Sequence, residues 1–238
     1  FDYDAATKTY TLKDGVPYAG EKGNVKPGMW KFKNIDGSKD NKITEADKTV
    51  IGNAYPKIYG GINNTFTYKD FDLSIFLTYS IGNDVFNATK LTNTKTALQN
   101  KNVLAVADSK HRWVLVNKAG DLITDPQEMA DINKGKTVAA IYDNEAGDTY
   151  IHSWAVEDGY FLKLSNITLG YTFPKKMIRK VGLSKLRLYA TGSNLLTWTK
   201  YSGFDPEVST MGNGLTPGVD FGAYPRSRAF VFGINLAF

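Results

Sequence analysis

Three stretches of the chain alternate between large apolar side chains and smaller or polar ones, with a period of two residues. In residues 71–81 the apolar positions are Phe71, Leu73, Ile75, Leu77, Tyr79 and Ile81. In residues 161–173 they are Phe161, Ile167, Leu169, Tyr171 and Phe173, opposite Asn166, Thr168, Gly170 and Thr172. Near the C-terminus they are Phe230, Phe232, Ile234, Leu236 and Phe238. Neighbouring side chains of a β-strand point to opposite faces, so each stretch predicts a strand with one apolar and one polar face. Residues 58–68 and 186–195 predict two more strands with weaker patterns.

The length of these stretches indicates where the strands lie. Strands of soluble proteins usually have about 5–6 residues, whereas strands that cross a membrane need ~9–11. The clearest stretches belong to the longer class. Their small or polar face does not suit a sandwich, in which large side chains from two sheets interdigitate. The pattern therefore favours an all-β, transmembrane antiparallel β-barrel, with a soluble, half-exposed sheet as the alternative.

Short and long connections alternate between the predicted strands. Tyr68, Lys69 and Asp70 form a tight turn, and residues 174–185 a short link that Pro174 opens as a helical turn and Gly182 closes. Residues 82–160 and 198–228 are long, and a short helix is expected from residue 125 to about residue 134. This alternation is typical of outer-membrane barrels, whose turns are periplasmic and whose long loops are extracellular. By the same parity the C-terminus is periplasmic.

The number of strands sets a further constraint. About five are visible, and the smallest single-chain outer-membrane barrels have eight. An open barrel would expose unpaired strand edges to hydrocarbon, which lipid does not tolerate. We therefore expect the C-terminal strands of a larger barrel. The chain starts with Phe1, without an initiator Met or a signal segment, and is expected to be a mature product or part of something longer.

Composition excludes several classes of function. The chain has no cysteine and only two histidines, His111 and His152, which argues against thiol chemistry and a histidine metal centre. Both histidines lie in a polar loop, where we expect them at the surface. The net charge is +5, but the basic residues are spread out and do not indicate nucleic-acid binding. No catalytic motif is present, and Asp205 and Glu207, two apart in a loop, are too common a pair to indicate catalysis. We do not expect an enzyme.

Residues 36–47 have the spacing of a calcium-binding loop. The ligands would be the side chains of Asp36, Ser38, Asp40 and Asp47 and the main-chain carbonyl of Lys42. Asn41 stands where such loops have glycine, and asparagine is the next best residue for a positive φ. Ser38 is a weaker ligand than aspartate, and Asp47 replaces a bidentate glutamate. The alternatives are a weak calcium site and an acidic, well-capped turn that holds no metal.

Aromatic residues in the long loops are the candidate ligand contacts. They are Trp113, Trp154, Tyr201, Phe204 and Tyr224. Such rings could stack on sugars or pack against a peptide. They could equally form an interfacial girdle, pack the loops together or seat a partner protein.

The chain resembles the C-terminal part of the SusC/RagA family of TonB-linked outer-membrane proteins of Bacteroidota. The resemblance extends over nearly everything from Pro27 onward. The matching segments are Pro27-Gly28, residues 36–47, Ile51-Gly52-Asn53, Tyr55-Pro56-Lys57, residues 68–74, 82–87, 156–160, Leu162-Lys163-Leu164, Leu169-Gly170-Tyr171, residues 192–197, 201–208 and 218–222, and the last strand with its terminal Phe238.

The resemblance implies a 22-stranded barrel whose plug domain and TonB-contacting segment lie upstream. It implies import of oligosaccharides or peptides across the outer membrane, together with a SusD-like lipoprotein that acts as a lid. We expect residues 1–56 to form an extracellular segment with the calcium-loop-like turn, and residues 57–238 to form barrel strands in contact with outer-membrane lipid, and outer loops. The alternative function is a surface-exposed β-domain that binds glycans without transport.

Overall fold

The computed structural model describes residues 1–95, 102–140, 150–210 and 217–238. These residues form two compact units, which are described separately. The first comprises Phe1–Ile51 and Thr89–Ala155, and the second comprises Gly52–Ala88 and Val156–Phe238. The predicted boundary between residues 1–56 and residues 57–238 stays a prediction. Each compact unit contains residues from both sides of that boundary.

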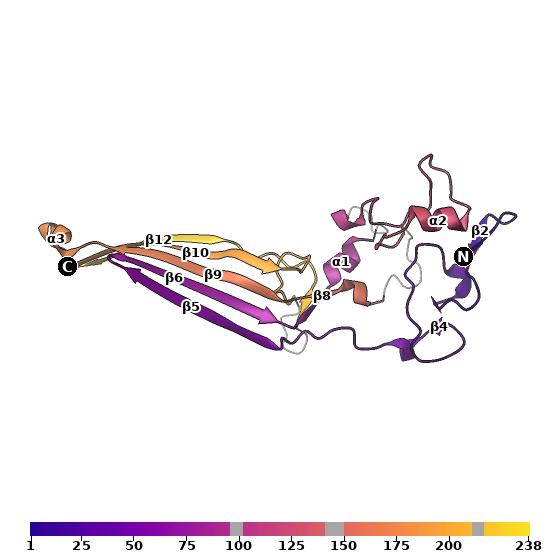
Figure 1. Cartoon of the computed structure of the whole chain (residues 1–238), viewed down its shortest axis with the longest axis horizontal. Coiled ribbons are helices and arrows are strands. Elements are labelled where there is room, and N and C mark those ends of the chain that lie inside the picture. The colour runs from indigo at the N-terminus through magenta and orange to yellow at the C-terminus, as the bar shows by residue number, and fades with distance from the viewer. Residues whose placement is uncertain (96–101, 141–149, 211–216) are drawn as a thin grey trace. The chain divides into compact units, whose positions relative to one another are not determined.

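A five-stranded antiparallel sheet dominates the second unit (Figure 1). Its spatial order is β12-β10-β9-β6-β5. The strands are β5 Ile58–Tyr68, β6 Phe71–Ile81, β9 Phe161–Thr172, β10 Lys185–Thr199 and β12 Ala229–Ala237. All five strands predicted from periodicity are confirmed, with lengths of 9 to 15 residues.

Strand register gives the sheet one apolar face and one polar face. An apolar row crosses all five strands through Tyr68, Phe71, Tyr171, Leu188 and Ile234. A row on the opposite face runs through Thr65, Ser74, Thr168, Thr191 and Val231. The apolar face is exposed, with Phe232 at 80% and Ile234 at 63% of their full accessibility. Apolar side chains presented on one face of long strands are the signature of a wall that meets lipid. The predicted fold class, a transmembrane β-barrel wall, is confirmed, and the count of 22 strands stays a prediction.

A β-bulge at Ser165 corrects the predicted faces of β9. On β6, the adjacent residues Phe76 and Leu77 pair with Asn166 and Leu164, so Ser165 is the extra residue. A bulge reverses the alternation of the residues before it. Phe161 consequently lies on the polar face at 8% exposure, and the prediction that it shares a face with Ile167 is wrong.

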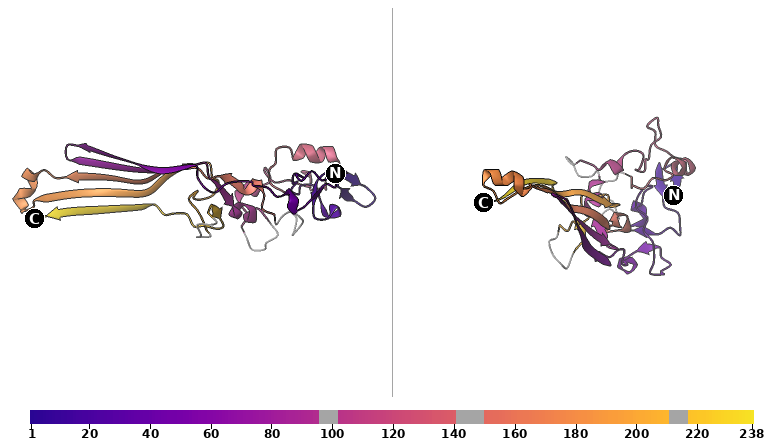
Figure 2. Two further views of the ribbon diagram at one scale, coloured as in Figure 1. Left: turned by 90° about the horizontal axis from the view of Figure 1, so that it is seen from below. Right: turned by 60° about the vertical axis from the view of Figure 1, so that its left-hand side comes forward.

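Short connections join the strands at the end of the sheet that we call the turn end. Lys69 turns the chain between β5 and β6 with φ of 53°. Pro174 precedes α3 Lys175–Ile178, which continues into η5 Arg179–Val181 and closes at Gly182 with φ of 77°. Both predicted turns are confirmed. The C-terminus lies at the same end (Figure 2).

Two glycines let bulky groups lie flat on the polar face near the turn end. A Cβ on Gly233 would lie 2.2 Å from the Tyr189 ring. A Cβ on Gly170 would lie 2.4 Å from Arg187 and 2.5 Å from Asp72, which form an ion pair of 2.5 Å across β9. The polar face is therefore closely packed here, because Gly233 and Gly170 have no side chain and leave room for the Tyr189 ring and for the ion pair.

The opposite end of the sheet, the loop end, carries a small three-stranded sheet. Its order is β11-β7-β8, from β7 Asp84–Asn87, β8 Val156–Asp158 and β11 Val219–Asp220. β7 pairs antiparallel with β8 and parallel with β11. Three segments far apart in sequence thus meet beside the ends of the long strands.

The first unit consists of short elements around a small core. The strands are β1 Asp2–Asp4, β2 Thr9–Thr11, β3 Tyr18–Ala19 and β4 Lys42–Ile43, and the helices are η1 Lys22–Asn24, η2 Glu45–Asp47, α1 Ala88–Asn93, η3 Ala105–Ala107, α2 Pro126–Ile132 and η4 Ser153–Ala155. Asp125 caps α2 by accepting from the Gln127 amide at 2.8 Å, as the sequence predicts. The core includes Ile123 and Val138 at 1% and 2% exposure. Within the described ranges, no helix has the length and apolar character needed to cross a membrane.

Candidate functional site

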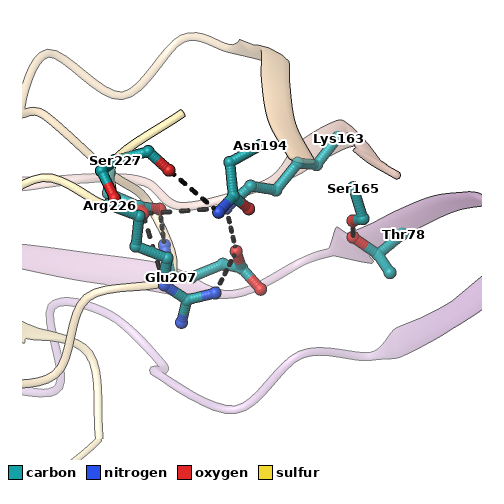
Figure 3. A network of polar contacts seen from close by, with 8 residues as sticks. Thr78, Lys163, Ser165, Asn194, Glu207, Arg226 and Ser227 are labelled. Atoms are coloured by element: carbon teal, nitrogen blue, oxygen red, sulfur yellow. Dashed lines mark hydrogen bonds and ion pairs between the residues drawn. The ribbon is translucent and has the colours of Figure 1, made fainter. Parts of the chain in front are cut away.

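Four charged side chains meet at the loop end, around Lys163 of β9 (Figure 3). The bulge at Ser165 turns Lys163 to the polar face, where its side chain is only 3% exposed. Its ammonium lies 2.5 Å from Glu207 Oε2 and 3.7 Å from Asp205 Oδ2. Arg226 reaches the same two carboxylates at 3.0 Å and 3.7 Å. Two positive and two negative charges thus compensate one another where an unpaired charge would be costly. We call these four residues the lysine cluster.

The loop after β10 supplies the two carboxylates, and it is tied to the small sheet. Ser202 binds Glu157 of β8 through its amide and its hydroxyl, both at 2.8 Å. Tyr201 is 5% exposed and donates to Asp220 of β11 at 2.6 Å. Burial, then the hydrogen bond to Asp220, raises the pKa of the Tyr201 phenol well above its ordinary value, so this donor keeps its proton. The loop is therefore held at both the small sheet and the lysine cluster.

A cavity of about 490 Å³ opens between this loop and the polar face of the long sheet. Its lining includes Tyr59, Phe76, Thr78, Ser80, Phe161 and Glu207. Aromatic faces and hydroxyl groups together suit noncovalent binding of a partly polar ligand. The cavity and the lysine cluster form the candidate site of the second unit.

Sequence analysis found only part of this site. Asp205 and Glu207 drew attention as a pair, but their partner Lys163 lies on a strand and Arg226 in a later loop. The available signal was Lys163 itself, a cation between Leu162 and Leu164 in a stretch that forms a barrel strand.

The five predicted ligand-contact aromatics lie in different settings. Tyr201 is buried, whereas Phe204 and Tyr224 in the second unit are 78% and 92% exposed. Trp113 and Trp154 belong to the first unit and are partly buried. Tyr201 thus has a packing role in this structure, and ligand contact by the five residues stays a prediction.

Trp154 belongs to an aromatic cluster that the sequence did not indicate. Its ring centroid lies 5.1 Å from that of Trp30, which in turn lies 4.5 Å from that of His152. The Lys90 ammonium lies 4.2 Å above the Trp154 ring. His152 is 9% exposed, and its Nε2 atom has no hydrogen-bond partner among the described residues. Burial, helped by Lys95 and Lys90, lowers the pKa of His152 to about 4. The expectation of a surface histidine is wrong for His152 and confirmed for exposed His111.

The calcium-loop-like segment is organised by hydrogen bonds from its own backbone. The Asp47 carboxylate accepts from the amides of Ile35 at 2.7 Å and Thr44 at 2.8 Å, and Asp40 accepts from Lys42 at 3.0 Å. These backbone bonds lower the pKa of both carboxyl groups. Asn41 has φ of 57°, which confirms its predicted conformation.

The arrangement of ligand groups in this segment bears on the metal prediction. In the portions of the chain described here, no three acidic or histidine side chains gather into a group that could hold a metal ion. Calcium binding by Asp36, Ser38, Asp40, Lys42 and Asp47 stays a prediction.

The fold and the site together define a segment of a transmembrane β-barrel. The sheet presents an apolar face to lipid, and its polar face carries a loop, a cavity and a compensated charge cluster. No family model matches the chain. Comparison with known proteins and solved structures identifies the kind of β-barrel protein.

The relatives are TonB-dependent receptors. TonB-dependent receptor P3 of Formosa agariphila is 31% identical over 221 residues, 91% of this chain and 20% of that protein. TonB-dependent receptor SusC of Bacteroides thetaiotaomicron is 28% identical over 206 residues, 86% of this chain and 17% of that protein. The RagAB peptide importer in its closed-closed state has the same fold, with a TM-score of 0.63 at 22% identity over 83% of this chain and 19% of that chain.

The chain belongs to the SusC/RagA family of TonB-dependent receptors, which are outer-membrane proteins. It spans about a fifth of the length of the relatives that it matches.

Proposed function

We propose that this chain supplies part of the barrel wall and outer loops of a TonB-dependent importer of oligosaccharides or peptides. The observation that carries the proposal is the two-faced sheet in a chain of this receptor family. The apolar face lets the wall sit in lipid, and the polar face can line a lumen that holds water and solutes. The barrel segment needs no bond chemistry for this role, and we propose no enzymatic activity.

We propose that the loop end is extracellular and the turn end periplasmic. The support is the asymmetry of the connections, which are short at one end of the sheet and long at the other. In this orientation Phe204 and Tyr224 are exposed on the outer side, and the cavity opens beneath the outer loops. We also propose that the complete barrel has 22 strands. TonB would act on a segment of the receptor that lies upstream of this chain.

Capture would use the outer loops together with a SusD-like lipoprotein. The loop after β10 is held by Tyr201, Ser202 and the lysine cluster, so it can present a fixed surface. Preorganised loops bind with a smaller loss of conformational entropy than mobile ones. RagAB is a peptide importer, and the aromatic and hydroxyl lining of the cavity also suits sugars. The proposal therefore includes both substrate classes.

The test replaces exposed aromatics in the full-length receptor. F204A/Y224A removes two exposed rings, and F204Y/Y224F keeps the aromatic surface as a matched control. We expect the alanine pair to weaken growth on the imported nutrient or co-purification of the lipoprotein, and the conservative pair to behave as wild type. A nutrient panel of oligosaccharides and peptides, with TonB depleted in a parallel culture, identifies the substrate class.

Two results would contradict the proposal. In the first, the full-length receptor inserts normally, but deleting it changes growth on none of the nutrients in the panel. The second is ligand binding at the cell surface with no TonB-dependent uptake, which would favour the glycan-binding alternative.

A further inference from the structure

The connection between β9 and β10 at the turn end is basic throughout. Residues 174–185 contain no acidic residue. Their cations are Lys175, Lys176, Arg179, Lys180 and Lys185, all exposed. Among the described residues, none of these five side chains forms an ion pair. The segment thus concentrates uncompensated positive charge, unlike the neutral lysine cluster at the loop end.

The same segment presents an apolar pair beside its cations. Ile178 is 3% exposed and anchors the helical turn, whereas Met177 and Val181 are 60% and 70% exposed. Both belong to the helical segment formed by α3 and η5, which also carries Lys175, Lys176, Arg179 and Lys180. Exposed apolar side chains beside cations are the arrangement of interfacial membrane segments.

The segment lies where the apolar face of the sheet ends. Tyr68 on that face is 71% exposed, and Phe238 at the turn end is 92% exposed. The neighbouring β5–β6 turn adds Lys69 and one acidic side chain, Asp70. The lipid-facing surface therefore passes directly into a cationic rim, at the depth where headgroups begin.

We propose that residues 174–185 bind anionic phospholipid headgroups of the periplasmic leaflet. This inference rests on the proposed function only in placing the turn end at that leaflet. The lysine and arginine heads meet lipid phosphates, while Met177 and Val181 enter the acyl region beside the barrel wall. The surface would fix the depth of the wall and enrich anionic lipid at this edge of the receptor.

The test uses the full-length receptor in nanodiscs of phosphatidylcholine and phosphatidylglycerol in equal parts. The measured quantity is the enrichment of phosphatidylglycerol that co-purifies with the receptor over its share in the bulk lipid. The variant K175Q/K176Q/R179Q/K180Q removes four cations, and K39Q/K110Q/K118Q/K134Q removes four exposed lysines from the first unit as a matched control. Each cation near an anionic surface contributes roughly fivefold in affinity, so we expect the first variant to lose the excess of phosphatidylglycerol that wild type shows over the bulk share.

The control variant is expected to keep the enrichment, and added salt of about 0.5 M is expected to abolish it in wild type because the charges are screened. Unchanged enrichment in the first variant, or an equal loss in the control, overturns the inference. Loss of growth with intact lipid enrichment would assign the cations to a protein partner and also overturns it. Normal enrichment in a receptor that imports nothing refutes the proposed function and leaves this inference standing.

Discussion

Removing the Lys163 charge tests whether the lysine cluster holds the outer loop against the barrel wall. The variant is Lys163→Met, which keeps the length of the side chain and removes the ammonium. Among the described residues, Arg226 is then the only cation that still pairs with Asp205 and Glu207; it is 54% exposed and lies 3.7 Å and 3.0 Å from them. The carboxylates are 14% and 24% exposed, so water compensates part of the loss.

The magnitude follows from this partial compensation. Removing one partner of a fully buried pair costs about 3–5 kcal/mol, because the remaining charge is left without compensation. Since Arg226 and some water remain, we expect the lower part of that range or slightly less, about 2–3 kcal/mol. The double variant K163M/E207Q also removes the stranded charge, and we expect it to lose less than K163M alone.

The assay is hydrogen exchange of the full-length receptor, followed in residues 201–210. K163M should raise the local exchange rate in this loop, and K163M/E207Q should restore part of the protection. Lys200→Met is the control, because Lys200 is exposed and follows β10 directly. Equal exchange in wild type and K163M, or an equal increase in K200M, would refute the role of the cluster.

Two further predictions concern lipid contact and pH. Ile234→Arg should cost ~2–4 kcal/mol of barrel stability in urea unfolding from vesicles, since Ile234 is 63% exposed on the apolar face. Val231→Arg, on the polar face of the same strand, should cost much less, and equal costs would contradict the assignment of faces. The unfolded chain takes up a proton at His152 near pH 6.5, whereas the folded first unit resists until about pH 4. Acidification through this window should therefore reduce local stability by up to about 3 kcal/mol. The measurement is hydrogen exchange of residues 150–156, whose protection should fall as the pH falls through this window. His152→Phe should remove this pH dependence. An equal pH dependence in that variant would exclude His152 as its source.

Local signals predicted much of the fold, because they depend on neighbouring residues. Alternation fixed the strands, and Pro174, Gly182 and Asp125 marked a turn and a helix start through their own backbone preferences. The bulge at Ser165 escaped detection because one extra residue leaves the apolar content of the stretch unchanged while reversing its faces.

The candidate site was less predictable because its parts come from distant segments. Glu207 lies 44 residues after Lys163, and no periodicity links a loop carboxylate to a strand lysine. His152 lies in a segment of polar composition, and the rings of Trp30 and Phe32, both distant in sequence, pack against it where it is buried. Composition describes the average environment of a loop, whereas burial of one side chain depends on tertiary contacts.

The edges of the long sheet connect its stability to the rest of the receptor. In the described residues, no strand pairs with the outer edge of β5 or β12. Each edge presents a row of backbone donors and acceptors, and hydrocarbon offers them no partner. The same two strands carry strongly exposed apolar side chains, including Phe66 at 57% and Phe232 at 80%. Lipid can cover those side chains, but only neighbouring strands can pair the edges. The wall therefore reaches its stable state inside a closed barrel, and each variant proposed above has its stated effect in the full-length receptor, where both edges are paired.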